Sequence, residues 1–191
     1  MGSEMCIRDR HSGPRALTLP PSCRWSGDHL ELLDQRQLPG AVVFMQLHRW
    51  QEVAEAISSM AVRGAPAIGI AAAWGVVLAA RSGDDLPTAI RGLRASRPTA
   101  VNLGWALNRM QAAMGSAVPV DVEALAGVAA ALQHEDRLLT QRLVDHGVSL
   151  LAQGCRVLHH CHTGAIATGG VGTALGVIAP QSPQGRFQRL P

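Results

Sequence analysis

The sequence predicts an α/β protein: an N-terminal β-hairpin and a helical domain, followed by the first β-α unit of a truncated parallel α/β domain. Two short β-rich runs come first, apolar residues then recur at helical spacing over residues 50–152, and a glycine-rich segment follows. The expected boundaries are a disordered or non-native-looking tail over residues 1–23, the hairpin and helical domain over 24–153, the truncated domain over 154–178 and an aberrant tail over 179–191.

The N-terminal elements are assigned in chain order. The first 23 residues have neither a helical nor a strand period and contain three prolines, so we expect a tail. From Arg24 onwards, the runs His29–Gln35 and Ala41–Leu47 are β-rich and flank Pro39-Gly40. This arrangement predicts an antiparallel pair with its turn at the proline and glycine.

Helical patterns follow the hairpin. After one amphipathic helix comes an almost wholly apolar helix, with Pro66 near its first position and Gly83 beyond its last turn. Another helix is expected to start at Pro98–Thr99, and the last to run from an Asp121 cap to about Ala152. The residues expected on the apolar faces of these last two helices are Val101, Leu103, Trp105, Ala106, Met110, Leu125, Val128, Leu132, Leu139 and Leu143.

The composition is that of a globular protein, with 47% hydrophobic and 16% charged residues in 191. The net charge is only +3 and aromatic residues make up 3%, so we expect no nucleic-acid partner. The four cysteines, without a signal-peptide pattern, favour a reducing, cytoplasmic compartment. The most apolar run, Ala65–Ala80, is shorter than the roughly 20 residues of a membrane span, so a buried helix is expected instead.

The C-terminal pattern changes after Gly154. The sequence predicts a short extended segment over Cys155–His160, which a glycine-rich loop connects to a helix over Thr173–Ile178. Strand, tight loop and helix in this order open a parallel α/β domain, which needs several more strands. Because residues from Ala179 onwards show no such pattern, we expect the chain to be a fragment.

The glycine-rich stretch allows several kinds of chemistry. A metal site is not expected from His159, His160, Cys161 and His162, because adjacent strand residues point to opposite faces and no CxxC or HxxxH spacing occurs. A dinucleotide cofactor is not expected either. The GxGxxxG pattern over 170–176 lies too far from the strand end and lacks the confirming acidic residue downstream. Close packing of the glycines remains the alternative to both.

Two arginines precede expected helix starts. Arg63 is followed by Gly64 and Ala65, and Arg97 comes directly before a second start. Helix N-termini favour anions, and arginine adds bidentate phosphate geometry, so the two starts could form a phosphate pocket, with Thr163-Gly164 at a third. The alternative for each arginine alone is a solvated turn.

Cys161 is the candidate for a chemical role. It would lie at the carboxyl end of the first strand, where ligands of such sheets bind. The alternative is a buried cysteine acting as a small hydrophobe, which is our interpretation of Cys155.

Three stretches together carry a family resemblance. "MAVRGAPAIGIAAAWGV", "SRPTAVNLGWALNRM" and "HHCHTGAIATGGVGTALGVI", in this order and spacing, resemble the methylthioribose-1-phosphate isomerases of methionine salvage. These belong to a wider family with ribose-1,5-bisphosphate isomerases and regulatory subunits of the translation-initiation guanine-exchange factor. The resemblance covers about residues 24–178.

The resemblance implies a β-hairpin and helical domain followed by a Rossmann-like domain, in a homodimer of the full-length protein. It implies an aldose–ketose isomerase that converts 5-methylthioribose 1-phosphate to 5-methylthioribulose 1-phosphate without a metal or nucleotide cofactor. By this resemblance Arg63, Gly64 and Ala65 hold the substrate, Arg97 makes a second substrate contact, and Cys161 is the catalytic cysteine.

The sequence also departs from the family pattern. An aspartate acts as the paired acid/base in the family, but it belongs to a downstream half that residues 179–191 do not match. We therefore expect the chain to be inactive as written. Alternatives within the wider family are a non-catalytic regulatory subunit that binds sugar phosphates or nucleotides, and a ribose-1,5-bisphosphate isomerase.

Overall fold

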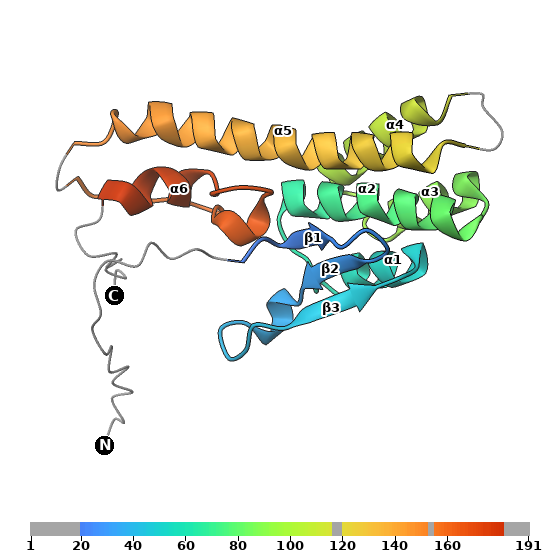
Figure 1. The fold of residues 1–191 in the computed structure, drawn as a ribbon. Helices are drawn as coiled ribbons and strands as arrows, with labels where there is room; N and C mark the ends of the chain where they lie inside the picture. The colour runs from blue at the N-terminus through green and yellow to red at the C-terminus, as the bar shows by residue number, and fades with distance from the viewer. Residues whose placement is uncertain (1–19, 116–119, 153–154, 182–191) are drawn as a thin grey trace, which may run out of the picture.

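The computed structural model describes residues 20–115, 120–152 and 155–181 (Figure 1). An antiparallel sheet of order β1-β2-β3 opens the described chain. The strands are β1 Cys23–Trp25, β2 Leu30–Leu33 and β3 Phe44–Leu47. The β2–β3 pair is the expected hairpin, with Leu33 opposite Phe44. Strand β1 was not foreseen, and its buried Cys23 lies one residue before the boundary expected at Arg24.

Helices make up most of the rest. They are α1 Trp50–Ser58, α2 Ala65–Ser82, α3 Leu86–Ala95, α4 Val101–Met114, α5 Val122–Val148 and α6 Ala174–Ile178, with short 3-10 turns η1 Gln35–Gln37, η2 Ala165–Ala167 and η3 Ala179–Gln181. Asp121 caps α5 as expected, because its carboxylate accepts a hydrogen bond from the Ala124 N–H at 3.0 Å. Gly83 ends α2 in the left-handed conformation, with φ of 70°.

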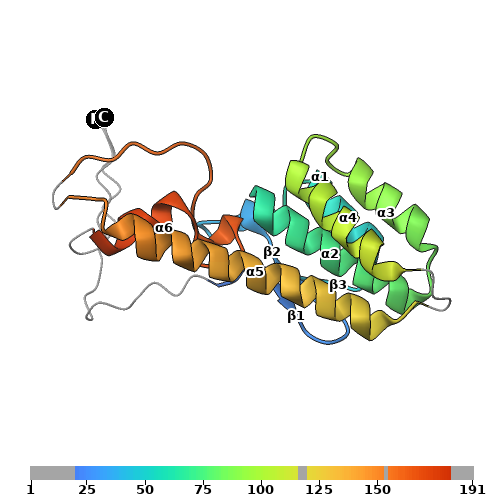
Figure 2. The same cartoon turned by 90° about the horizontal axis from the view of Figure 1, so that it is seen from above.

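Helix α2 is the centre of the fold. The sheet packs on one side of it, and α4 and α5 pack on others (Figures 1 and 2). Every residue from Ala67 to Ala79 is buried. Trp74 joins three elements, because its ring stacks on Trp25 of β1 at 4.6 Å and its indole N–H donates to Gln133 of α5 at 3.1 Å. By length and composition α2 alone, among the described residues, could cross a membrane, but 72% of it is buried, as in a core helix.

Some residues expected on buried helix faces are exposed instead. Val101 and Trp105 of α4 are 82% and 51% exposed, because only the stripe of Leu103, Ala106, Leu107 and Met110 is buried. On α5, Leu125 and Leu132 are buried as expected, whereas Leu139 and Leu143 are exposed. Helix α5 is longer than α2, and beyond the start of α2 it lies over α6 (Figure 1).

The prediction of a strand over Cys155–His160 is wrong. These residues are exposed and form no strand, so the first β-α unit predicted from the sequence is not present in the described chain. A strand needs a neighbour to pair its N–H and C=O groups, and the described strands pair only among themselves. The helical part of the prediction does form, as the short α6 that packs on α5.

Candidate functional site

All five residues singled out from the sequence line one cavity. We call this cavity of about 460 Å³ the arginine cavity. Its walls are Arg63, Gly64, Ala65, Pro66, Ile68, Arg97, Thr99, Ala100, Val101, Asn102, Cys161, His162, Ala167, Thr168 and Thr173. Segments up to about a hundred residues apart in the sequence therefore meet at a single site.

Two helix N-termini open onto the arginine cavity. Helix α2 begins after Gly64 and helix α4 after Ala100, and no side chain caps either of these starts. Free N–H groups and the helix macrodipole make such ends attractive to anions. Arg63 and Arg97 add two guanidinium groups, and none of the described residues lining the cavity is acidic. The electrostatics of this site therefore favour a phosphate or carboxylate.

Gly64 brings the two walls of the cavity into contact. Its φ is +99°, a region that L side chains rarely adopt, and a Cβ built on it would lie 2.5 Å from the backbone of Ala167. The start of α2 therefore touches η2 through backbone atoms. Any side chain at Gly64 would push these walls apart.

Cys161 and His162 enter the cavity from the opposite wall. Both are exposed, and Cys161 has a φ of 75°, which is uncommon for a residue other than glycine. His159 and His160 do not line the cavity, and His159 Nδ1 lies 3.3 Å from Thr163 Oγ1. Within the described ranges, no three His, Cys, Asp or Glu side chains gather as metal ligands would. Cys23 is a buried free thiol, whereas Cys155 and Cys161 are exposed free thiols, so the interpretation of Cys155 as a buried cysteine is wrong. Cys6 lies outside the described residues.

The glycines of the C-terminal segment lie against neighbouring backbone and side chains. A Cβ on Gly170 would approach Thr140 Oγ1 of α5 to 2.4 Å, and one on Gly176 would approach Val144 to 2.8 Å. Gly172, at φ +93°, forms an isolated bridge with Gly164. This supports close packing as the reason for the glycines, against helix α5 rather than against a strand.

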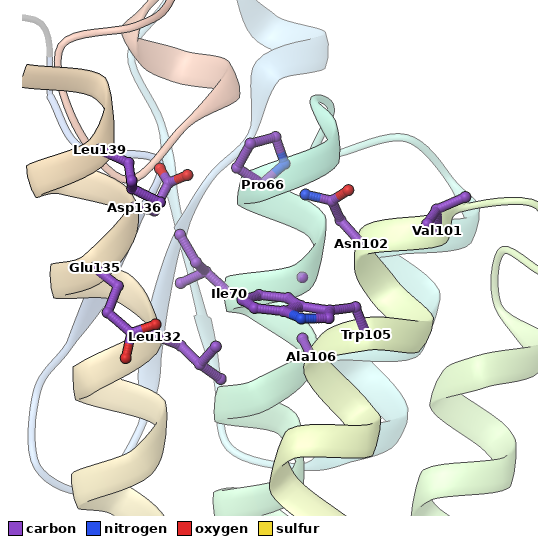
Figure 3. A pocket seen from close by; sticks show the side chains of 11 residues that line it. Pro66, Ile70, Val101, Asn102, Trp105, Ala106, Leu132, Glu135, Asp136 and Leu139 are labelled. Atoms are coloured by element: carbon purple, nitrogen blue, oxygen red, sulfur yellow. The ribbon is translucent and has the colours of Figure 1, made fainter. Parts of the chain in front are cut away.

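A second cavity of about 390 Å³ adjoins the first, and we call it the apolar cavity (Figure 3). It is lined by Pro66, Gly69, Ile70, Val101, Asn102, Trp105, Ala106, Leu132, Glu135, Asp136 and Leu139. Pro66, Val101 and Asn102 line both cavities. Figure 3 shows that α2, α4 and α5 supply its three walls, with the Trp105 indole reaching toward Ile70.

Two carboxyl groups border the apolar cavity, and their pKa values are shifted in opposite directions. Glu135 forms an ion pair with Arg109, which lowers the pKa of the Glu135 carboxyl. Asp136 is half-buried, and burial raises the pKa of its carboxyl, although a hydrogen bond from the Gly169 N–H at 2.6 Å opposes that rise. Asp136 thus fastens the glycine-rich segment to α5.

Several lining residues were not foreseen from the sequence. Asn102 connects both cavities, and Thr168 and Thr173 line the arginine cavity from the glycine-rich segment. A polar residue in the otherwise apolar run Val101–Leu107 was an available signal for Asn102. The threonines had no such signal, because their position depends on how the glycines fold back on α5.

The fold and its cavity define a class of protein: an α/β domain with a ligand cavity that favours anions. The chain belongs to the Initiation factor 2 subunit family, which matches residues 61–189.

A methylthioribose-1-phosphate isomerase from Synechococcus sp. (strain CC9605) is 88% identical over 169 residues, covering 88% of this chain and 50% of that protein. The crystal structure of 5-methylthioribose 1-phosphate isomerase from Pyrococcus horikoshii OT3 is similar with a TM-score of 0.77 and 32% identity, over 84% of this chain and 49% of that one. The crystal structure of the translation initiation factor eIF-2B, subunit delta, from A. fulgidus is similar with a TM-score of 0.68 and 35% sequence identity. The match covers 83% of this chain and 49% of that one. The chain thus spans about half the length of these relatives.

Proposed function

We propose that this chain is the first half of a methylthioribose-1-phosphate isomerase, and that the arginine cavity holds the phosphate of its substrate. One observation carries the proposal: two uncapped helix starts, two arginines and Cys161 line the same cavity. The similarity to isomerases over half their length supports the choice of substrate.

Each candidate residue then has a role. The guanidinium groups of Arg63 and Arg97 bind phosphate oxygens, and the backbone at Gly64 and Ala65 presents the start of α2 to the same group. Cys161 faces the sugar and assists proton or hydride movement between C1 and C2. An aspartate from the downstream half of the enzyme acts as its paired acid/base.

The domain organisation is part of the proposal. We assign residues 24–153 to the hairpin and helical domain, together with the buried Ser22 and Cys23 that precede them, and residues 154–178 to the start of a Rossmann-like domain. The extended run at Cys155–His160 becomes a strand only beside the further strands of that domain. The complete enzyme is a cytoplasmic homodimer.

A fusion protein tests this function. Residues 20–181 are joined to the second half of the Synechococcus sp. relative, and conversion of 5-methylthioribose 1-phosphate to the ketose is assayed. We expect turnover by the fusion, and a fall in kcat of about 10²–10⁴-fold for Cys161→Ser. Cys155→Ser, an exposed cysteine outside the cavity, is the matched control and should leave kcat unchanged. A fusion that turns over equally well without the Cys161 thiol contradicts the catalytic role.

A regulatory subunit of the same family is the second candidate, favoured by the similarity to the subunit delta structure. It would bind a sugar phosphate or nucleotide in the arginine cavity without converting it. Tight binding by the fusion with no turnover under any condition would select this candidate over the isomerase.

A further inference from the structure

Gln35 joins the two walls of the arginine cavity from outside it. Its side-chain Nε2 donates to the backbone carbonyl of Ile166 at 2.8 Å and to that of Arg63 at 3.3 Å. One carboxamide therefore uses both of its N–H groups on segments that are more than a hundred residues apart. Gln35 itself does not line the cavity.

The position of Gln35 is fixed by the hairpin. It is the first residue of η1, which follows β2 after Asp34, and its backbone N–H donates to the Ala61 carbonyl at 2.8 Å. The Ser22 hydroxyl also donates to the Ile166 carbonyl. The backbone of η1 thus fixes the start of a side chain that reaches two backbone carbonyls, that of Arg63 before α2 and that of Ile166 in η2.

Each of the two carbonyls belongs to the residue that precedes a contact between the cavity walls. Arg63 precedes Gly64, and Ile166 precedes Ala167, and these two followers make the close backbone contact described above. In a trans peptide the C=O and the next N–H point in opposite directions, so a fixed Arg63 carbonyl also fixes the Gly64 N–H. Gln35 therefore restrains the backbone that carries the Arg63 side chain.

We propose that Gln35 is a positioning residue for anion binding, acting through Arg63. This inference rests on the proposed function, because it assumes that the arginine cavity binds phosphate. Gln35 has no comparable contact with Arg97, which lies in the turn between α3 and α4. Its effect on binding should accordingly depend on Arg63 and not on Arg97.

A double-mutant cycle with inorganic phosphate tests the inference. Binding is followed by NMR, from the amide shifts of Gly64 and Asn102 in the full chain, which also detects weak affinity. We expect Arg63→Ala and Arg97→Ala each to weaken binding about tenfold, and Gln35→Met to weaken it about fivefold. In the Arg63→Ala background the Gln35→Met effect should become clearly smaller, because only the contribution through the Gly64 N–H remains, whereas in the Arg97→Ala background it should persist in full.

Controls separate positioning from a loss of stability. Gln51→Met, at an exposed glutamine of α1, should bind phosphate as the unchanged chain does. Urea unfolding confirms that each variant is folded during the titration. Gln35→Asn, which keeps a carboxamide that is one methylene too short, repeats the cycle if the methionine variant does not fold.

The outcomes distinguish the two proposals. An equal Gln35→Met effect in both arginine backgrounds, or no effect at all, overturns the positioning role while leaving the arginine cavity intact. If the unchanged chain shows no phosphate-dependent shifts, or if both arginine variants bind normally, the anion cavity itself is wrong and the role of Gln35 falls with it.

Discussion

The region around α2 and the segment over residues 155–181 are held in place by different means. The α2 region is stabilised by buried side chains, since every residue from Ala67 to Ala79 is inside the core. In the other segment only Ala167, Thr168 and Gly172 are buried among the described residues. That segment is held by a hydrogen bond that Gln35 donates to Ile166, by one that Asp136 accepts from the Gly169 N–H, and by close backbone contacts at its glycines. The stability of the α2 region therefore depends on the volume of its buried side chains, and the position of residues 155–181 depends on backbone hydrogen bonds and close backbone contacts.

The largest expected effect comes from removing core volume. Leu107→Ala, at a fully buried position of α4, should lower the free energy of unfolding by about 2–5 kcal/mol. Leu158→Ala, which makes the same change at an 89% exposed leucine, should change it by less than about 0.5 kcal/mol. Urea unfolding followed by tryptophan fluorescence measures both. Comparable losses for the two variants would mean that the second segment has a side-chain core of its own.

A backbone contact should give the next largest effect. Gly64→Ala places a Cβ 2.5 Å from Ala167, whereas Gly27→Ala has nothing within 4 Å, and both glycines have a φ near +95° to +99°. Gly27→Ala should therefore report conformational strain alone, of about 1–2 kcal/mol. Gly64→Ala should cost about 1–3 kcal/mol more, because neighbouring atoms must move. Equal melting temperatures for the two variants would contradict the close contact between α2 and η2.

The smallest expected effect is electrostatic and depends on pH. Burial raises the pKa of Asp136 in the folded chain, so its charged form opposes folding at neutral pH. Stability attributable to this group is complete below the unfolded pKa of about 3.9 and is lost as pH rises through the folded pKa. Asp136→Asn should thus stabilise the chain at pH 7 by less than about 1 kcal/mol, since the half-exposed carboxyl is screened.

The matched variant for this effect is Asp145→Asn, at an exposed position of the same helix α5. Thermal unfolding at pH 7 and pH 4 should show a gain for Asp136→Asn that shrinks at the lower pH, and little change for the control. A loss of stability at pH 7 would show that the hydrogen bond to Gly169 needs the carboxylate charge.

Most of the helical fold was predictable because its signals are local. Pro66 and Gly83 mark the ends of α2, Asp121 marks the start of α5, and the hairpin turns at Pro39-Gly40. Strand β1 was missed because its three residues gain their place by pairing with β2. The exposed Trp105 was misplaced for a related reason: periodicity identifies an apolar face but not how much of it a neighbour covers.

The sequence predicted some of the residues that line the arginine cavity, but not the residues that hold its walls together. Arg63, Arg97 and Cys161 precede or follow recognisable turns, and the structure places all three on one cavity. Gln35 and Asp136 act on backbone groups that are distant in the sequence, and no spacing rule connects them. The strand expected before Cys161 failed because a strand is defined by its neighbours and not by its own composition.

The start of α2 belongs both to the arginine cavity and to the helix that forms the core. Binding of an anion at the start of α2 would therefore also stabilise the folded state of the chain. Ligand that binds only the folded chain adds about 2.7 kcal/mol to the unfolding free energy at a hundredfold excess over Kd. If the arginine cavity binds an anion as proposed, the melting temperature of the chain will rise with the concentration of that anion in solution.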